Sequence, residues 1–501
     1  MLALLLVPAA ASGESLRVLD TLVLDYRGDN GNANEADDNY ALGYTKLYLT
    51  GESEGTSARA QVDGVYFFTD FPDAEVGVKP EDSAYKNEAR LERLSIAHEI
   101  GDFKLTLGDF HKQVGRGIAL SLRRVDELGV DKALRGGQVE YEGDTVSWNA
   151  FAGRTNISNL DGVTQKFLED PEDTIAGAVG TVHLGTTDLS AYGVLLKPSV
   201  PTLEGKDDRT LIGGAYAELP AADWLSLYGE AAISQYLIAD KSFSGTAAYA
   251  TADVNLRVVN LLLEGIYLDQ WTVAGSMDTV LFNRPTVYNQ PPTLERLDME
   301  VLDYENVQGG RAKISKSFLD GDLIVYVNGL FRRFGPESAI VDAMHGYGGF
   351  ELAYDGGRSR WFASGGYRDE VQDSRSIKTI THGETDWVQS LGSGWALHLT
   401  VNHESRTLED ADDFLRGTTL LGVEKDGRWS LTGEFGYDTQ FEDQENEFYA
   451  GIVTYQPADW MNLRAVVGSE RGGIKCIGGV CREYPAFSGA RLEASVQHDL
   501  L

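Results

Sequence analysis

Apolar and polar residues alternate one by one, over segments of about ten residues, along most of the chain. Residues 395–402 place Trp, Leu, Leu and Val on one face and Ala, His, Thr and Asn on the other. Residues 225–234 and 461–467 alternate in the same way. Because successive side chains of a β-strand point to opposite faces, the pattern predicts strands with one apolar and one polar face. The spacing of an amphipathic helix is not sustained anywhere in the sequence.

Strand length and connection length distinguish a membrane barrel from a soluble sandwich, which uses strands of the same kind. The predicted strands approach the roughly 9–11 residues of a tilted membrane-spanning strand, whereas strands of soluble proteins have about 5–6. The connections alternate between short turns, such as 101–102 and 143–144, and long polar loops, such as 154–174 and 268–304. Short turns on one rim and long loops on the other are typical of outer-membrane barrels.

The predicted fold class is therefore all-β: one large, closed, antiparallel transmembrane β-barrel of about 24 strands, with roughly 22 to 26 as the range. We expect the short turns on the periplasmic side and the long loops on the extracellular side. The side chains of the wall cannot fill a barrel this wide, so its lumen is either aqueous or plugged. No separate plug domain precedes the first predicted strand, which argues against a plugged, energy-coupled transporter.

The first twelve residues read MLALLLVPAAAS. An apolar core followed by small residues is typical of a secretory signal, which predicts a signal peptide over 1–11 and the barrel over 12–501. The usual positive n-region is missing, so we expect a truncated start, and a buried first strand is the alternative. No run of about 18 apolar residues follows, which argues against a transmembrane helix.

Two turns nearly repeat each other, with Pro-Ala-Ala-Asp before Trp224 and Pro-Ala-Asp before Trp460. Each turn places a Trp at the start of a predicted strand. Aromatic residues gather at this level in membrane proteins, where the lipid meets water. We therefore expect Trp224 and Trp460 at the membrane interface. A locally favourable Pro-Asp turn is the other interpretation, and the two are compatible.

Charge adds one feature that the strand pattern does not predict. The chain has 77 acidic and 43 basic residues and a formal net charge of -34 at pH 7. This balance argues against nucleic acid as a partner. One segment, 111–136, is nevertheless rich in basic residues: Lys112, Arg116, Arg123, Arg124, Lys132 and Arg135.

The basic segment also contains glycines for sharp bends, including Gly115 and Gly117, and apolar residues such as Ile118 and Leu120. A loop of this length is usually functional or disordered, and its apolar content argues against disorder. We expect segment 111–136 to fold inward against the wall, with its cations forming a pore constriction that favours anions. The alternative is that the cations pair with carboxylates of the lumen and brace the wall, and both can hold.

The two cysteines, Cys476 and Cys481, lie close together in the last long loop, with glycines between them. This spacing predicts a disulfide, whose small ring contributes roughly 2 kcal/mol in the loop-closure model. A metal or redox role is the weaker alternative, because zinc needs four ligands and the sequence offers no others nearby. No metal site and no cofactor are predicted.

Catalytic motifs are absent from the sequence: no GxSxG, HExxH or P-loop pattern occurs. His111 and His398 are better interpreted as polar groups of the lumen than as general bases. No catalytic residue is therefore assigned, and the protein is not expected to be an enzyme.

The runs GDF at 108–110, GRG at 115–117 and DKALRG at 131–136 resemble a family of uncharacterised bacterial outer-membrane β-barrel proteins. The late segment 471–489, which contains both cysteines, is similar to the end of related proteins. The resemblance implies a location in the outer membrane of a Gram-negative bacterium and supplies no activity. The chain ends in Leu501, whereas barrel proteins of this kind commonly end in an aromatic residue.

We therefore expect a porin-like outer-membrane channel for small solutes, including anionic ones, with a lumen narrowed by the basic segment. The alternative is a non-conducting structural or docking barrel for a periplasmic or surface partner, such as a redox protein or a lipoprotein. Outer-membrane lipid, lipopolysaccharide and the barrel-assembly machinery are the other expected partners.

Overall fold

The computed structural model describes residues 15–29, 38–69, 85–202, 207–278, 284–296, 299, 306–409, 411–440, 445–477 and 480–500. The signal peptide predicted at 1–11 lies outside these residues. Among the described residues, none of the helices has the length and apolar character needed to span a membrane.

A single antiparallel sheet of 25 strands dominates the described residues. One of these strands, β8 (Arg124–Val125), has two residues and pairs only with β9. The other 24 strands form the wall, as predicted. In chain order they are β1 (Ser15–Arg27), β2 (Tyr40–Ser53), β3 (Thr56–Phe67), β4 (Glu88–Ile100), β5 (Phe103–Phe110), β9 (Val130–Glu142), β10 (Val146–Ile157), β11 (Thr174–Leu184), β12 (Thr187–Lys197), β13 (Arg209–Ala222), β14 (Leu225–Ile238), β15 (Lys241–Asn255), β16 (Asn260–Asp269), β19 (Val307–Phe318), β20 (Leu323–Phe334), β21 (Val341–Tyr354), β22 (Ser359–Gln372), β23 (Arg375–Gly392), β24 (Trp395–Leu408), β25 (Ala411–Lys425), β26 (Trp429–Asp438), β27 (Glu447–Ala458), β28 (Met461–Glu470) and β31 (Phe487–Asp499).

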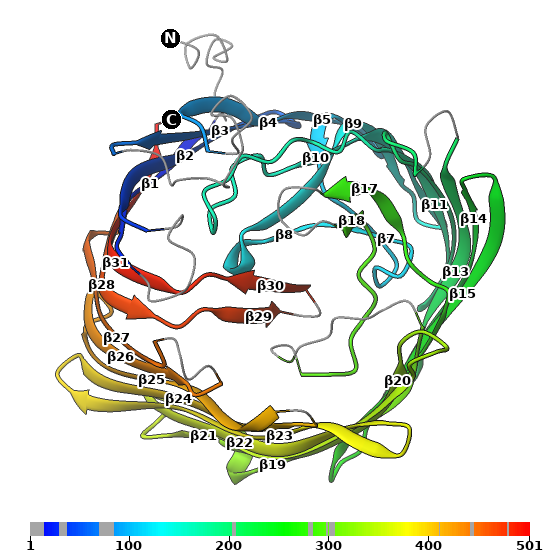
Figure 1. The fold of residues 1–501 in the computed structure, drawn as a ribbon. Helices are drawn as coiled ribbons and strands as arrows, with labels where there is room; N and C mark the ends of the chain where they lie inside the picture. The colour runs from blue at the N-terminus through cyan, green and yellow to red at the C-terminus, as the bar shows by residue number, and fades with distance from the viewer. Residues whose placement is uncertain are drawn as a thin grey trace.

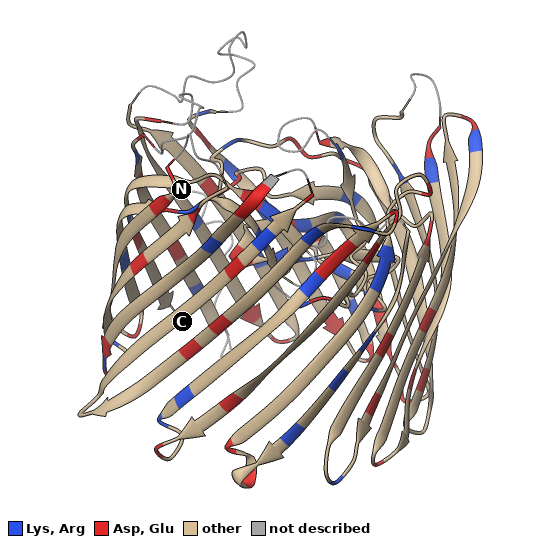
Figure 2. Cartoon of the chain, turned by 60° about the horizontal axis from the view of Figure 1, so that its bottom comes forward, with Lys and Arg blue, Asp and Glu red and all other residues tan. Residues whose placement is uncertain are grey.

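The first and last strands close the barrel. β1 pairs with β2 on one edge and with β31 on the other, so that Arg17 lies opposite Asp499 and Arg27 opposite Gly489. The sheet therefore has no free edge, which is what a barrel in lipid requires, since backbone groups cannot bond to water there. Figure 2 shows the tilted strands and the turns gathered at the two rims.

The predicted short turns lie on one rim, together with the start of β1 and the end of β31. The opposite rim differs from the prediction because some of its connections are also two-residue turns, and two of these are described in full. Ala239 and Asp240 join β14 to β15, and Asp373 and Ser374 join β22 to β23. All four residues have positive φ, between 50° at Asp373 and 66° at Asp240. Turns of this type match the twist of a β-hairpin and need no longer loop.

The outer face of the wall is apolar, as β14 illustrates. Ile233 points outward and is 67% exposed, whereas the neighbouring Ala232 and Ser234 point inward and are buried. Exposed apolar side chains recur around the whole circumference, as at Val327 on β20 and Val467 on β28. An apolar belt on a closed barrel has its natural place in lipid, and we therefore describe the protein as a transmembrane barrel.

Three groups of short elements lie inside the ring of strands (Figure 1). The first group belongs to segment 111–136, the second follows β16, and the third is a hairpin that precedes β31. Their elements are β6 (Lys112–Val114), β7 (Leu120–Leu122) and the 3-10 helix η3 (Asp126–Leu128); β17 (Ala274–Asp278) and β18 (Arg284–Val287); and β29 (Gly473–Ile477) and β30 (Val480–Tyr484).

The inward elements pack against the wall from β10 to β16 through a continuous apolar core. Ile118 and Leu120 of the basic segment and Trp271 after β16 are completely buried in it. On β12 the inward positions are Tyr192, Val194 and Leu196, and they too belong to the core. A polar lumen face was expected for every strand. This part of the wall is apolar on both faces because packed chain, and not water, covers its inner side.

Candidate functional site in the barrel lumen

The tip of the β6–β7 hairpin docks on a buried carboxylate of β14. The backbone N–H of Arg116 donates to Glu230 Oε2 at 2.9 Å, and the hydroxyls of Tyr192 and Tyr228 donate to the two Glu230 oxygens at 2.9 and 2.6 Å. Gly115 has a φ of +53°, and a Cβ there would lie 2.5 Å from Glu230 Oε1. A glycine at this position therefore allows the close approach of the hairpin to the wall.

The second inward group covers the basic segment. We call residues 288–296, which follow β18, the strap. The N–H of Gln290 donates to the carbonyl of Gly117 at 2.8 Å, and the N–H of Ser121 donates to the carbonyl of Tyr288 at 2.7 Å. Trp271 Nε1 donates to the carbonyl of Ile118 at 3.0 Å. The basic segment is thus held between the wall and the strap.

Asp173, at the end of the β10–β11 loop, joins that loop to the strap. Its carboxylate accepts bonds from the Tyr288 hydroxyl and the Ser276 N–H, both at 2.8 Å. Burial and the neighbouring Asp173 raise the pKa of Tyr288 well above its ordinary value of 10.0. The hydroxyl therefore remains a donor at neutral pH.

Three of the six predicted constriction residues contact carboxylates. Arg116 lies 3.6 Å from Glu218 and stacks on Tyr228, 4.8 Å from the ring centre. Arg124 pairs with Asp126 and donates to the Tyr48 hydroxyl at 2.9 Å. The third is Arg135, which pairs with Asp109 at 3.1 Å.

Each of the other three predicted constriction residues contacts a neutral group, and the carboxylate of Asp278 also acts on the charge of Lys132. Arg123 Nε donates to Gln290 Oε1 at 2.7 Å, and Lys132 Nζ donates to the carbonyl of Val287 at 2.8 Å. Lys112 Nζ lies 5.4 Å from the centre of the Phe151 ring, and burial lowers its pKa. Each of the six cations thus contacts another group of the lumen, and for Arg116 and Arg135 that group is a carboxylate of a wall strand.

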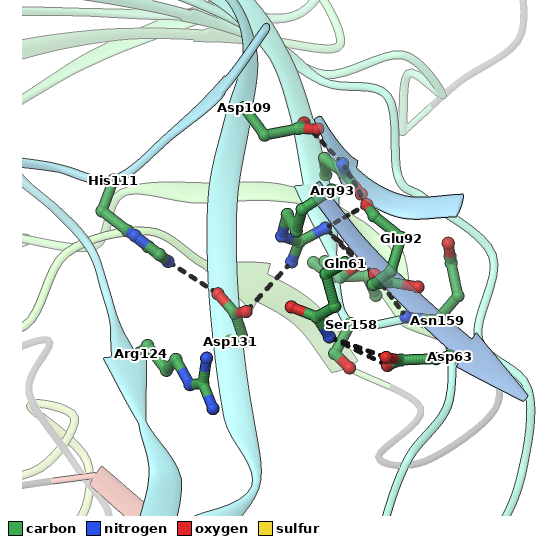
Figure 3. Close-up of polar contacts among 12 residues, drawn as sticks. Gln61, Asp63, Glu92, Arg93, Asp109, His111, Arg124, Asp131, Ser158 and Asn159 are labelled. Atoms are coloured by element: carbon green, nitrogen blue, oxygen red, sulfur yellow. Dashed lines mark hydrogen bonds and ion pairs between the residues drawn. The ribbon is translucent and has the colours of Figure 1, made fainter. Parts of the chain in front are cut away.

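A buried polar cluster anchors the two ends of segment 111–136 to the wall (Figure 3). Asp131 accepts a hydrogen bond from His111 at 2.7 Å, and its other oxygen lies 3.5 Å from Arg93 on β4. Arg93 also pairs with Glu92 at 3.0 Å. The second carboxylate, Asp109, receives Arg135. The charges of the cluster are therefore arranged in alternating sign, which fixes the base of the segment.

The β29–β30 hairpin carries the disulfide between Cys476 and Cys481. Next to it, Arg482 is buried, pairs with Asp161 and donates to the carbonyl of Leu128 at 3.1 Å. The hydroxyl of Tyr484 donates to the carbonyl of Glu127 at 2.9 Å. The disulfide-bonded hairpin thus lies inside the barrel and is hydrogen-bonded to the η3 part of the basic segment.

These segments meet around a partly open cavity of about 260 Å³. Residues that the sequence singled out separately line it together: Arg123 and Lys132 from the basic segment and Cys481 from the disulfide hairpin. The cationic side chains of the lining are Arg123, Lys132, Arg284 and Arg482, and the anionic ones are Asp131, Asp161 and Asp278. The cavity is therefore the candidate site, whereas Lys112, Arg116, Arg124 and Arg135 lie outside its lining.

The two predicted interface aromatics lie in short turns at one rim of the barrel. Trp224 and Trp460 are about half exposed and directly precede β14 and β28, on the rim with the short turns. No three His, Cys, Asp or Glu side chains among the described residues are grouped so that they could hold a metal ion.

A second polar site was missed in the sequence. Glu295 of the strap accepts a bond from His345 Nδ1 at 2.8 Å, and His345 Nε2 lies 2.9 Å from His382 Nε2. Arg368 lies 3.5 Å from Glu295, and Arg296 pairs with Glu384. The sequence signals this site only through polar residues at inward positions of the strands. Nothing near Glu295 in the chain indicates which strands it contacts.

Comparison with known proteins supports the predicted resemblance to an uncharacterised family. Residues 374–498 match the model of a family of unknown function (DUF6029). The match contains the late segment 471–489 but not the runs at 108–136. No curated protein matches the chain.

Several solved structures share the fold at low sequence identity. A point mutant of the ferric enterobactin receptor PfeA from Pseudomonas aeruginosa has a TM-score of 0.51 and 10% identity, over 98% of this chain and 81% of the receptor. The siderophore receptor PirA of the same organism gives 0.49 and 9%, over 97% and 80%. The outer membrane protein OpdK, also from P. aeruginosa, gives 0.39 and 9%, over 79% and 98%. The likeness to PfeA shows the fold alone, a large barrel of the outer-membrane type.

Proposed function

We propose that the protein is an outer-membrane channel through which small solutes, anions in preference, cross a lumen narrowed by segment 111–136. The observation that carries the proposal is the docking of this basic segment inside the barrel, with its tip on Glu230 and its apolar residues in the core. Cations fixed along a narrow passage favour anions, and they act more strongly there than in bulk water.

The test is the reversal potential of the purified protein in planar bilayers under a salt gradient. We expect open current steps with a preference for anions. Replacing Arg116, Arg123 and Arg124 together by Ala should shift the reversal potential towards cations. Arg358→Ala is the control, because Arg358 is exposed and pairs with Asp355 in the turn between β21 and β22. An unchanged reversal potential in the triple variant would contradict the anion preference.

The second candidate is a non-conducting barrel that docks a periplasmic or surface partner. The observation that favours it is the continuous apolar core between the inward elements and the wall from β10 to β16. The same bilayer recording separates the candidates: a silent membrane with correctly inserted protein favours the docking barrel, and current steps favour the channel.

A further inference from the structure

Three side chains near the rim with the short turns form a chain of hydrogen bonds on the inner face of the wall. His183 Nδ1 lies 2.8 Å from Asp188 Oδ1, and His183 Nε2 lies 3.1 Å from the Ser147 hydroxyl. Ser147 is the second residue of β10, His183 the last but one of β11 and Asp188 the second of β12. Three neighbouring strands therefore place an aspartate, a histidine and a serine in the order of a catalytic triad.

The two bonds of His183 determine which of its nitrogens carries the proton. An ionised carboxylate only accepts hydrogen bonds, so in the neutral ring the bond to Asp188 requires the proton on Nδ1. The lone pair of Nε2 then accepts the hydrogen of the Ser147 hydroxyl. In this state the ring can take up the serine proton as the hydroxyl oxygen attacks, and the carboxylate stabilises the charged ring that forms.

A second cluster of similar residues on the inner face of the wall lacks this order. His398 Nε2 lies 2.8 Å from Asp386 Oδ2 and 3.3 Å from the Thr400 hydroxyl. One nitrogen faces both groups, so the carboxylate does not hold the other nitrogen towards the hydroxyl. Among the described residues, His183 is the only histidine bonded to a carboxylate through one nitrogen and to a hydroxyl through the other. The triad is therefore not a general consequence of polar residues that face the lumen.

A hydroxyl that can stabilise an oxyanion lies opposite Ser147. Thr181 of β11 is the ladder partner of Ser147, and Cβ atoms of such partners are about 4.5–5.5 Å apart. The hydroxyls of Thr181 and Ser190 lie 2.8 Å apart, and either can be the donor. With Ser190 as the donor, the hydrogen of Thr181 remains for an oxyanion that forms on an acyl group at Ser147.

The surroundings of Ser147 select the charge of a substrate. On the other side of β10, Glu142 of β9 lies opposite Ser147. Its carboxylate repels an anionic acyl group and accepts an uncharged one. The side chains of His183 and Asp188 are 28% and 45% exposed, so water and small molecules reach the site from the lumen.

We propose that Ser147, His183 and Asp188 form a catalytic triad that hydrolyses uncharged carboxylic esters. Ser147 Oγ forms a bond to the acyl carbon, and its proton passes to His183 Nε2. The same proton then passes to the alcohol, which leaves as its bond to the acyl carbon breaks. Water attacks the acyl carbon in turn, gives its proton through His183 back to Ser147 and releases the carboxylic acid. Asp188 is a positioning residue, because it contacts His183 and not the reacting atoms.

The sequence gave no signal for this site. The GxSxG motif places its serine on a turn from a strand to a helix, whereas Ser147 lies within a strand. His183 and Asp188 join it only through the pairing of β10, β11 and β12.

The test uses the full chain in lipid nanodiscs and an alkyl fluorophosphonate, which forms a P–O bond with a nucleophilic serine and releases fluoride. We expect mass spectrometry to find the label on Ser147, and we expect the same preparation to hydrolyse para-nitrophenyl acetate. Ser147→Ala should abolish both reactions. His183→Ala should slow labelling about 100-fold or more, since a general base is lost. His398→Ala, in the cluster without the triad order, is the matched control and should leave both rates unchanged.

Two further variants test the supporting residues. Thr181→Val keeps the shape of the side chain and removes its hydroxyl, which should slow ester hydrolysis about 100-fold. Asp188→Asn keeps a bond to the ring but favours the wrong tautomer, so it should slow labelling strongly. Asp188→Glu keeps the carboxylate and should restore most of the rate, whereas a merely structural Asp188 would tolerate Asn.

An inserted, unmodified chain that carries no label on Ser147 would overturn the proposal, and this result does not depend on whether a variant folds. Equal slowing in His183→Ala and His398→Ala would overturn it as well. The outcome is separate from that of the bilayer recording, because the triad requires access to the lumen and not a current across the membrane.

Discussion

The two sides of the lumen hold their inward segments with different side chains. Strands β10–β16 present apolar residues, such as Val194 and Leu196, to the basic segment and to the start of the strap. Strands β21–β23 present His345, Arg368 and His382 to the end of the strap, where Glu295 is completely buried. Strands β10–β16 therefore hold the inward segments mainly through packing, and strands β21–β23 hold the end of the strap mainly through charge and hydrogen bonds.

This difference has consequences for how each contact responds to its surroundings. Packing is non-directional and insensitive to protonation. A buried charged cluster is directional and depends on every partner, because removing one partner leaves an uncompensated charge. The strap is thus fixed by packing near Tyr288 and by titratable groups near Glu295. Its start has one bond to a carboxylate, from Tyr288 to Asp173, whereas several charged groups surround its end. We therefore expect the end of the strap to respond to pH more than its start.

The largest effect should come from breaking the apolar side. Trp271→Ala removes a completely buried side chain and its bond to the carbonyl of Ile118. Loss of a buried Trp typically costs about 3–5 kcal/mol, here from the docking of segment 111–136. Hydrogen exchange should therefore become faster in residues 111–129, which lie inside the barrel, and should remain slow in the wall strands, including β9. Trp460→Ala, on the rim with the short turns, is the matched control, and unchanged exchange in residues 111–129 of the Trp271 variant would refute the packing role.

A smaller, pH-dependent effect is expected at the charged side. Burial tends to raise the pKa of Glu295, but the hydrogen bond from His345 and the charge of Arg368 outweigh it, so the pKa lies below the ordinary 4.5. A lowered pKa in the folded state stabilises the contact above pH 4.5, and the stabilisation is lost as the pH falls through the lowered value. The protection of residues 288–296 against exchange, corrected for the intrinsic pH dependence of amide exchange, should therefore fall below pH 4.5.

Glu295→Gln isolates that carboxylate from the other titrating groups around it, which are His345, His382, Glu384 and Glu370, with Arg296, Arg332 and Arg368 as fixed charges. The variant should loosen the strap at neutral pH by roughly 1.5–3 kcal/mol, the value of a hydrogen bond to a charged group. Its exchange should also depend less on pH. A strap with the same acid response in both proteins would show that Glu295 is not the sensor.

The sequence predicted the strands of the barrel wall more completely than the contacts of the segments inside the barrel. Period-two alternation and turn residues are local signals, and they predicted the 24 strands of the barrel. The inward face of β12 could not be predicted, because Val194 and Leu196 belong to an apolar core whose other members, such as Ile118 and Tyr288, lie more than fifty residues away in the chain. The same reason hid Glu295, whose neighbours on β21–β23 lie in another part of the sequence. The cavity likewise forms between segments that are far apart in the chain. The sequence therefore singles out Arg123, Lys132 and Cys481 separately but does not indicate that they line one cavity.

The smallest effect on stability is expected at Arg124. Its side chain is partly exposed and pairs with Asp126, two residues away in the same segment. One exposed hydrogen bond, to the hydroxyl of Tyr48, joins it to β2 of the wall. Exposed pairs contribute about 0–1 kcal/mol, and Arg124→Met should leave exchange in 111–136 nearly unchanged. The charge of Arg124 nevertheless faces the lumen beside Tyr48. The variant should therefore shift the reversal potential towards cations without loosening the segment, and a loosened segment with an unchanged potential would instead make Arg124 a brace.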